Sequence, residues 1–379
     1  MVFDPQDNIF MLAGPVKIHP KVLNAMCVPS IGHRSPEFSA INEEIKNLLK
    51  YLFQTKNDVA VFSGSGTAGM DAAISNLIKK QDKLLTINNG KFGERMGQLA
   101  RLYGDATELV YPWGVIPDTE EIEEKLSAGD IKVLAFTHNE TSTGFTNPLQ
   151  EIAKICQKYD TILITDGITS VGGIEVPVDK WGVDVCITGS QKCIAAPAGL
   201  APMSVSQKAL DAMYDDTSYY LNIKKYVKKL RDDNQTPYTP AIPLHLALLE
   251  ALRIIKEEGL ENRIKRVKNI ADACRAAIDA LGLELLVQNK KYASDTVTAI
   301  KYPKGISDKD VRGTLKTKHG IVVAGSQVPH KGEFFRIGHM GNVQMRELVA
   351  AIGALESTLS NLGMKIEKGA GVAAIEKYM

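Results

Sequence analysis

The chain has 379 residues, 44% of them hydrophobic, so it can bury a large core, and two domains are expected. Lys and Arg total 45 against 44 Asp and Glu, without a long block of like charge, which argues against nucleic acid or an anionic membrane surface as a partner. The five cysteines lack the paired spacing of zinc sites or a disulfide framework, so we expect a reducing cytoplasm and no metal centre. Neither a signal peptide nor a membrane span is expected, because no basic leader and no long apolar run occurs.

Residues 1–18 are expected to form an N-terminal arm, and residues 19–255 a large α/β domain. Short apolar runs alternate there with amphipathic, helix-like segments, and each run ends in a polar or glycine break. The runs with their ends read DVAVFSG, LLTINNG, VLAFTHNE, TILITDG and DVCITGS. This alternation of strand-like and helix-like segments predicts a mostly parallel mixed sheet between helices. Ligands of such sheets bind beyond the carboxyl ends of the strands, where these polar residues would converge.

A long helical pattern begins near residue 245, breaks at Gly259 and leads into a smaller α+β domain, expected over residues 256–379. TVTAIKYP and IVVAG predict strands in that domain. DKDVRGTLKTKH and NVQMRELVAAIGALESTLSNLG predict amphipathic helices. The expected fold class is therefore α/β, with a large domain and a smaller C-terminal one.

The stretch VFSGSGTAGM contains Gly64-x-Gly66-x-x-Gly69, the spacing of a dinucleotide-binding loop, between a predicted strand and a predicted helix. Glycines let the backbone approach a ligand, and the free N–H groups of a helix start favour an anion. A dinucleotide site also requires an acidic residue about 20 positions further on, and INNGKFG has none there. A phosphate site is therefore favoured over a dinucleotide site, although an ordinary strand-to-helix turn also fits the spacing.

Two other predicted strand ends carry reactive side chains. Asp166 ends the run TILITDG, and Lys192 follows DVCITGSQ and precedes the apolar CIAAPAGLAPM. A lysine in an apolar pocket has its ammonium form disfavoured, which makes it a usable nucleophile. Taken singly, Lys192 could be a surface lysine and Asp166 a helix N-cap. Together with the glycine loop they match what pyridoxal phosphate needs, namely a phosphate anchor, an amine for the aldehyde and a carboxylate for the pyridine nitrogen.

The motifs SGSGT, NGKFGER, THNETSTG, LITDGITSVGG, TGSQK, PYTPAIP and FFRIGHMG occur in this order. They resemble the class V, fold type I aminotransferases, in the alanine:glyoxylate and serine:pyruvate branch, over nearly the whole chain. The resemblance implies that Lys192 binds pyridoxal phosphate covalently and carries the substrate proton, and that Asp166 pairs with the pyridinium nitrogen. It further implies a cofactor-binding set made of Ser65, Gly66, Thr67 and Gln191 at the phosphate, Thr141 near the polar edge of the ring, Ile168 under the ring and Phe92 stacked on it. Taken alone, Phe92 would equally be a core residue.

The resemblance also implies a substrate site and an assembly. Arg336 in FFRIGHMG would bind the substrate α-carboxylate, although by itself it would be interpreted as a surface ion-pair arginine. Relatives reach the neighbouring subunit's phosphate with a Tyr and a Thr. Tyr238 matches the Tyr, whereas Ala241 stands nearest to the Thr position, so Thr239 is the expected substitute. A homodimer with active sites at its interface is therefore expected.

His33 and Arg34 in GHRS resemble the pair that phosphoserine aminotransferases use at the substrate phosphate. Two basic side chains there would favour a phosphorylated or dicarboxylate substrate, whereas a structural ion pair of Arg34 is the other interpretation. We expect a ping-pong aminotransferase that moves an amino group from serine, alanine or aspartate to glyoxylate or pyruvate. Phosphoserine or aspartate specificity is the alternative.

Three other functions compete with this prediction. Cysteine desulfurases share the cofactor and fold, but AGSQVPHKGEFFR lacks their catalytic cysteine, and Gln191 stands where they commonly have a His. Cys193, next to the lysine, fits a packing residue better than a nucleophile. A nicotinamide (NAD) dehydrogenase rests on the glycine spacing alone, and a non-enzymatic binding protein would not need the lysine, the aspartate and the arginine together.

Overall fold

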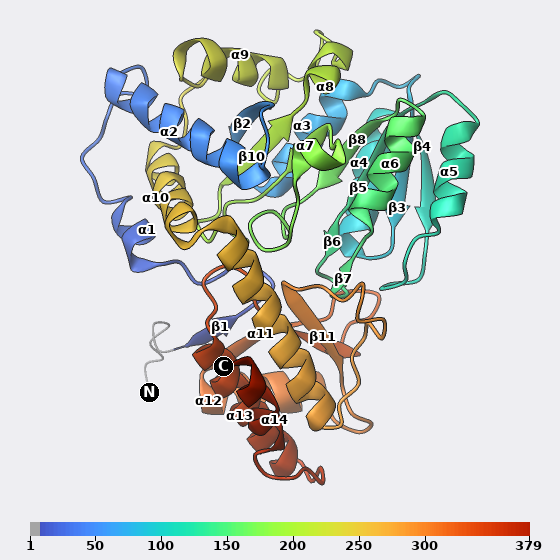
Figure 1. The fold of residues 1–379 in the computed structure, drawn as a ribbon, viewed down its shortest axis with the longest axis vertical. Helices are drawn as coiled ribbons and strands as arrows, with labels where there is room; N and C mark the ends of the chain where they lie inside the picture. Colours follow the sequence, from blue (N-terminus) through green and yellow to red (C-terminus); the bar gives the residue numbers. More distant parts are fainter. Residues whose placement is uncertain (1–7) are drawn as a thin grey trace.

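The computed structural model describes residues 8–379. Its larger sheet has seven strands in the order β2-β10-β9-β8-β5-β3-β4 (Figure 1). β10 is antiparallel to both of its neighbours, and the other pairs are parallel. The strands are β2 (Asp58–Ser63), β3 (Lys83–Asn88), β4 (Asp105–Val110), β5 (Ile131–Thr137), β8 (Ile162–Asp166), β9 (Val185–Ile187) and β10 (Leu200–Val205). The mostly parallel mixed sheet expected from the sequence is confirmed, and β4 and β10 add two strands that were not predicted.

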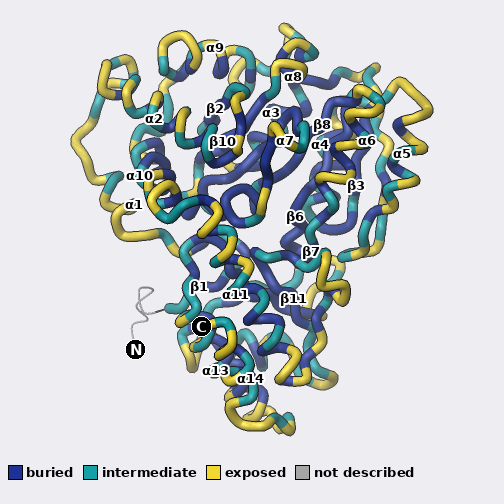
Figure 2. The backbone as a smooth tube through the Cα atoms, in the orientation of Figure 1, coloured by how far each residue is buried: buried dark blue, intermediate teal, exposed yellow. Residues whose placement is uncertain are grey.

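Helices cover both faces of this sheet, because successive strand residues point to opposite sides. In β5, Leu134 and Phe136 pack into the core on one face, and Val133 and Ala135 into the core on the other. Figure 2 shows these strands as the buried interior of the upper half. The first face is covered by α1 (Pro20–Asn24), α2 (Pro36–Phe53), α5 (Thr119–Ser127), α6 (Leu149–Lys158), α7 (Val178–Trp181) and α10 (Ile242–Glu258), and the second by α3 (Gly66–Leu77), α4 (Lys91–Tyr103), α8 (Gln207–Ala212) and α9 (Ile223–Asp233).

The carboxyl ends of the central parallel strands meet at one edge of the sheet. Thr137 at the end of β5 pairs with Asp166 at the end of β8, and Asp166 pairs with Ile187 at the end of β9. A short hairpin, β6 (Asn139–Glu140) and β7 (Phe145–Thr146), follows β5 at the same edge. The chain thus brings polar side chains from separate βα units to one place.

The predicted helical span with a break at residue 259 corresponds to α10 and α11 (Leu260–Ala280). Gly259 has a φ of +83°, a conformation that favours glycine, and this turn separates the two helices. Figure 1 shows α11 running from the large sheet down along the smaller one. Within residues 8–379, no helix combines the length and the apolar composition needed to cross a bilayer.

The smaller sheet has the order β1-β12-β13-β11 and packs against α11. Its strands are β1 (Ile9–Met11), β11 (Val297–Lys301), β12 (Ile321–Gly325) and β13 (Phe334–Gly338). The remaining helices are a π-helical turn at Lys309–Gly313, α12 (Thr314–His319), α13 (Met345–Asn361), α14 (Ala370–Ile375) and a 3-10 turn at Glu376–Tyr378. β1 comes from the start of the chain and pairs in parallel with β12, so the N-terminal segment is attached to the C-terminal sheet (Figure 1).

Candidate active site

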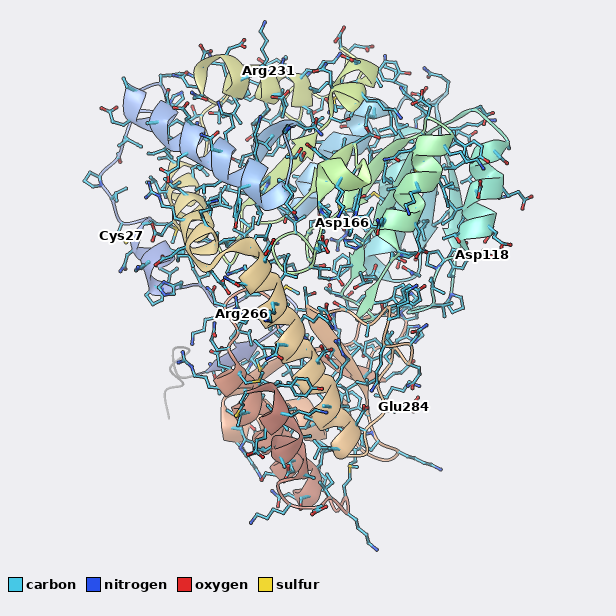
Figure 3. The ribbon with its side chains drawn as sticks, viewed as in Figure 1. Cys27, Asp118, Asp166, Arg231, Arg266 and Glu284 are labelled. Atoms are coloured by element: carbon cyan, nitrogen blue, oxygen red, sulfur yellow. The ribbon has the colours of Figure 1, made fainter. Side chains whose placement is uncertain are left out.

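A cavity of about 260 Å³ lies at the carboxyl edge of the large sheet. Asp166, labelled in Figure 3, lies in its wall in the interior of the molecule. The structure brings together here most of the residues predicted to bind the cofactor: Ser65, Gly66, Thr67, Phe92, Asp166, Ile168, Gln191 and Lys192. Arg95, Thr137, Asn139 and Thr169 complete the wall and were not predicted. Thr137 could have been found, because it ends the run next to the one that ends in Asp166.

The glycine loop forms one end of the cavity, between β2 and α3. Ser65 is the N-cap of α3, but its hydroxyl makes no hydrogen bond to the helix backbone, so it is available to a ligand together with the N–H groups of the first turn. A Cβ on Gly66 would lie 2.4 Å from Cδ1 of Ile168, so any larger residue here would displace the Ile168 side chain at the cavity wall. Oε1 of Gln191 is buried without a hydrogen-bond partner in the described part of the chain. This end of the cavity therefore suits an anion that also carries a hydrogen-bond donor or is bridged by water.

Asp166 is a buried carboxylate at the end of β8. It accepts hydrogen bonds from the Ile168 N–H at 2.9 Å and the Thr137 hydroxyl at 3.2 Å. Burial raises its pKa, while these hydrogen bonds and the positive charges of Arg95 and Lys192 act in the opposite direction. A carboxylate held in this way can stabilise a protonated ring nitrogen.

Lys192 lies on the turn after β9, in the same cavity. Burial lowers the pKa of its amine to about 8, and the nearby charges of Arg336 and Arg95 act in the same direction. Its Nζ donates a hydrogen bond to the carbonyl of Ala13 at 2.6 Å. A substantial fraction of the amine is therefore neutral near pH 7, as nucleophilic attack on a carbonyl requires.

Phe92 is fixed by a buried carboxylate at the start of α4. Oε2 of Glu140 accepts the N–H groups of Phe92 and Gly93, each at 2.9 Å. Oε1 accepts the N–H of Ser142 at 3.1 Å and its hydroxyl at 2.5 Å. A Cβ on Gly90 would lie 2.2 Å from Cγ of Glu140, so the helix start has room for this carboxylate only because residue 90 is glycine. Glu140 thus caps α4 and sets the position of the Phe92 ring.

Arg95 is the main functional candidate that sequence reasoning missed. Its guanidinium lies 5.0 Å from the centre of the Phe92 ring, and Nη1 donates to the Thr67 hydroxyl at 3.2 Å. Residues 92 and 95 are three apart on α4 and therefore share one helix face, a spacing that could have revealed Arg95. It places a permanent positive charge beside the glycine loop, which favours an anion there.

Arg336 and Thr141 lie together beside this cavity but are not part of its wall. Arg336, on β13, donates from Nη1 to the Thr141 carbonyl at 2.8 Å and from Nε to the Gly325 carbonyl at 3.1 Å. Burial lowers the pKa of Arg336 to about 10, and the charge of Glu140 opposes that shift. The guanidinium remains protonated at neutral pH, so a buried cation lies close enough to Lys192 to lower the pKa of its amine.

The structure does not bring His33, Arg34, Tyr238 and Thr239 to the cavity wall of the same chain. Arg34 instead donates to the carbonyls of Thr236 at 2.5 Å and Pro237 at 3.0 Å. His33 lies 3.5 Å from the Thr239 hydroxyl. The GHRS segment therefore holds the segment that carries Tyr238.

These residues fit pyridoxal phosphate on structural grounds. The cavity joins an anion-binding helix start with an unpartnered amide oxygen, Gln191 Oε1, to a buried amine and a buried carboxylate. Ser65, Gly66 and Thr67 would hold the phosphate together with the side-chain amide N–H groups of Gln191, and Arg95 would supply a counter-charge. Asp166 would face the ring nitrogen and Lys192 the aldehyde. When bound, the cofactor supplies an electron sink for the bonds of the substrate α-carbon.

Comparison with known proteins identifies the family. The family model described as aminotransferase class-V matches residues 21–338. An uncharacterized aminotransferase of Methanocaldococcus jannaschii is 44% identical, over 98% of this chain and 98% of its own. Serine–glyoxylate aminotransferase of Methylorubrum extorquens is 33% identical over 99% and 96%, and the crystal structure of ureidoglycine–glyoxylate aminotransferase from Bacillus subtilis has a TM-score of 0.92 at 32% identity, over 98% and 97%. The chain therefore belongs to the class-V aminotransferases, which are pyridoxal-phosphate-dependent transaminases.

Proposed function

We propose that this enzyme moves the amino group of a small amino acid, in the serine, alanine and aspartate class, to a 2-oxo acid such as glyoxylate or pyruvate by a ping-pong mechanism. The observation that carries the proposal is the buried amine of Lys192, which shares a cavity with Asp166 and lies within electrostatic reach of the cationic Arg336. Glyoxylate occurs in the names of two of the relatives described above, whereas their amino donors differ. The acceptor is therefore the better supported half of the proposal.

The proposed roles follow from the chemistry of each side chain. Lys192 would hold the cofactor in the resting enzyme, and its neutral Nζ, once released, would accept the α-proton of the substrate and later give up that proton to complete the transfer. Asp166 would stabilise a protonated ring nitrogen. Phe92 and Ile168 would hold the ring between them, and Thr141 would bind near its polar edge. Arg336 would bind the substrate α-carboxylate, because its planar guanidinium can form two parallel hydrogen bonds with a carboxylate. Its present hydrogen bonds go to the Gly325 and Thr141 carbonyls, so the substrate would use N–H groups that these carbonyls leave free or release.

The His33–Arg34 pair is the alternative determinant of specificity. The present contacts of Arg34, to two backbone carbonyls and to Oε1 of Gln235 at 3.2 Å, favour a positioning role for the segment that carries Tyr238. A phosphoserine or dicarboxylate site would need at least part of this guanidinium to be free. The preference between serine, aspartate and phosphoserine in wild type and Arg34→Ala distinguishes the two roles.

We further propose a homodimer in which Tyr238 and Thr239 reach the phosphate in the partner's cavity. Tyr238 stacks on Tyr220 with ring centres 5.5 Å apart, and Tyr219 beside them is 75% exposed. Such an exposed aromatic cluster is typical of an interface. Ala241 offers no hydroxyl, and its N–H faces Oγ of Ser63 at 3.4 Å, so Thr239 is the nearby hydroxyl that can replace the missing Thr.

A test of the dimer combines light scattering with mixed dimers. One chain carries Lys192→Ala and the other Tyr238→Ala, so that a shared site restores one intact cavity per heterodimer. Activity recovered on mixing supports the proposal. A chain that is monomeric in light scattering and fully active contradicts it.

The transaminase proposal is tested by half-reaction spectroscopy. The holoenzyme is mixed with serine, alanine, aspartate or phosphoserine, and the visible band of the lysine-bound cofactor is followed. We expect at least one of the first three to bleach this band, and glyoxylate or pyruvate to restore it. Lys192→Ala is expected to lack both the band and turnover, and a Lys192→Ala enzyme with wild-type activity would refute the assignment.

A cysteine desulfurase activity is the second candidate, and the structure disfavours the thiol that follows Lys192 in the chain. Cys193 is fully buried, its Sγ lies 3.2 Å from the Thr169 carbonyl, and burial raises the pKa of the thiol to about 12. A nucleophilic cysteine needs an accessible thiolate. Sulfide release from cysteine at a rate comparable to transamination would favour this second function.

A further inference from the structure

The N-terminal segment crosses the amine of Lys192. Nζ of Lys192 donates to the Ala13 carbonyl at 2.6 Å. Three residues further along, the Val16 N–H donates to the carbonyl of Gln191 at 3.1 Å. The segment thus runs alongside the loop that carries the lysine and supplies the amine's hydrogen-bond acceptor.

Gly14 leaves the space that the lysine side chain fills. A Cβ at this position would lie 2.2 Å from Cδ, 2.5 Å from Nζ and 2.7 Å from Cε of Lys192. Gly14 also has a φ of +85°, in the region that favours glycine. Any side chain here would therefore displace the lysine stem along most of its length.

The N-terminal segment around residues 12–16 also packs tightly against β13, the strand that carries Arg336. A Cβ on Gly338, at the end of β13, would lie 2.1 Å from the Leu12 carbonyl oxygen. Beyond that strand, a Cβ on Gly341 would lie 2.8 Å from Cγ2 of Val16. A small apolar cluster joins the segment to both neighbours; it consists of Ala13, Val16, Cys193, Ala195, Val297 and Met340. Close packing on both sides fixes where the Ala13 carbonyl points.

We propose that Ala13 and Gly14 are positioning residues for Lys192: the Ala13 carbonyl is the acceptor that holds its free amine, and Gly14 is required because the lysine stem occupies its side-chain space. This inference rests on the proposed role of Lys192. A displaced nucleophile or base loses much of its rate even when it moves by about 1 Å. The segment therefore determines how fast the amine reaches a carbonyl in the cavity.

The first test measures covalent capture of pyridoxal phosphate by the apoenzyme, followed by the visible absorption in a stopped-flow instrument. Gly14→Ala is expected to lower the rate at high pH, where the amine is neutral, by about tenfold or more. Gly363→Ala is the matched control, because Gly363 has a φ of +89° and no atom within 4 Å of an added Cβ. Affinity for inorganic phosphate, measured by calorimetry, is expected to be unchanged in both variants, because the glycine loop is not altered.

The second test weakens the acceptor and leaves every side chain unchanged; the ester also lacks the Gly14 N–H. A synthetic segment 1–26 with an ester between residues 13 and 14 is joined to a chain that begins at Cys27, which is exposed. An ester carbonyl is a weaker hydrogen-bond acceptor than an amide carbonyl. The ammonium form of Lys192 loses more by this change than the neutral amine does, because an ammonium group donates the stronger hydrogen bond. The ester should therefore lower the pKa of the Lys192 amine. We expect the pH at which the capture rate reaches half its maximum to fall by about half a unit, with little change in the rate at high pH.

The outcomes separate this inference from the proposed function. Slower capture in Gly14→Ala, together with a lower half-maximal pH of capture in the ester-containing protein, supports the positioning role. A high-pH rate in Gly14→Ala within about twofold of wild type, or an unchanged half-maximal pH in the ester-containing protein, overturns it. If Gly14→Ala does not fold, the ester decides. If wild-type apoenzyme itself captures no pyridoxal phosphate at Lys192, the proposed function fails instead.

Discussion

The lowered pKa of Lys192 makes a quantitative prediction for the apoenzyme. The amine attacks the cofactor only when it is neutral, so the capture rate should rise with pH and level off above about 8. At pH 7 a lysine with a pKa of about 8 is about 10% neutral, whereas an ordinary lysine is only about 0.03% neutral. Burial and its two cationic neighbours therefore raise the reactive fraction by about 300-fold.

Removal of one neighbour tests the electrostatic part of this reasoning. Arg95→Gln should raise the pH at which the capture rate is half-maximal, because a positive charge that disfavours the ammonium form of Lys192 is lost. Arg101→Gln is the matched control, since Arg101 lies on the same helix, is half exposed and pairs with Glu108. Stopped-flow absorbance between pH 6 and 10.5 measures both variants. A wild-type rate that levels off only above about pH 10 would refute the lowered pKa.

Three further substitutions test the other parts of the site. Asp166→Asn removes the charge that stabilises a protonated ring nitrogen, so half-reaction rates should fall by about a hundredfold or more, and a change below threefold would contradict this role. Arg336→Lys cannot form the forked pairing, so KM for the amino donor should rise by about tenfold to a hundredfold with a smaller change in kcat, and an unchanged KM in steady-state kinetics would count against substrate binding. Glu140→Gln leaves at least one buried N–H of Phe92, Gly93 or Ser142 unpaired and should cost about 1–3 kcal/mol, seen as a lower melting temperature. Glu123→Gln, at a partly exposed surface ion pair with Lys158, should lower the melting temperature much less.

The sequence by itself determined the elements whose signal is local. Apolar runs that end in polar residues predicted β2, β3, β5, β8 and β9, because the side chains of buried strands and the turns after them are set by neighbouring residues. Parallel strands place their carboxyl ends at one edge, so Ser65, Asp166 and Lys192 could be expected together, and the structure brings them into one cavity. The resemblance to the class-V family added the assignments of individual contacts.

Only the tertiary structure decided the contacts between segments far apart in the chain. Ala13 meets Lys192 across 179 positions, and Glu140 caps α4 from 48 positions away. Arg34 was weighed as a substrate residue, yet it donates to backbone carbonyls near Tyr238 across more than 200 positions. Such contacts depend on how separate elements pack, and nothing in the neighbouring residues encodes them. The groups that position the reactive side chains therefore became visible only when β1, the lysine loop and β13 were placed against one another.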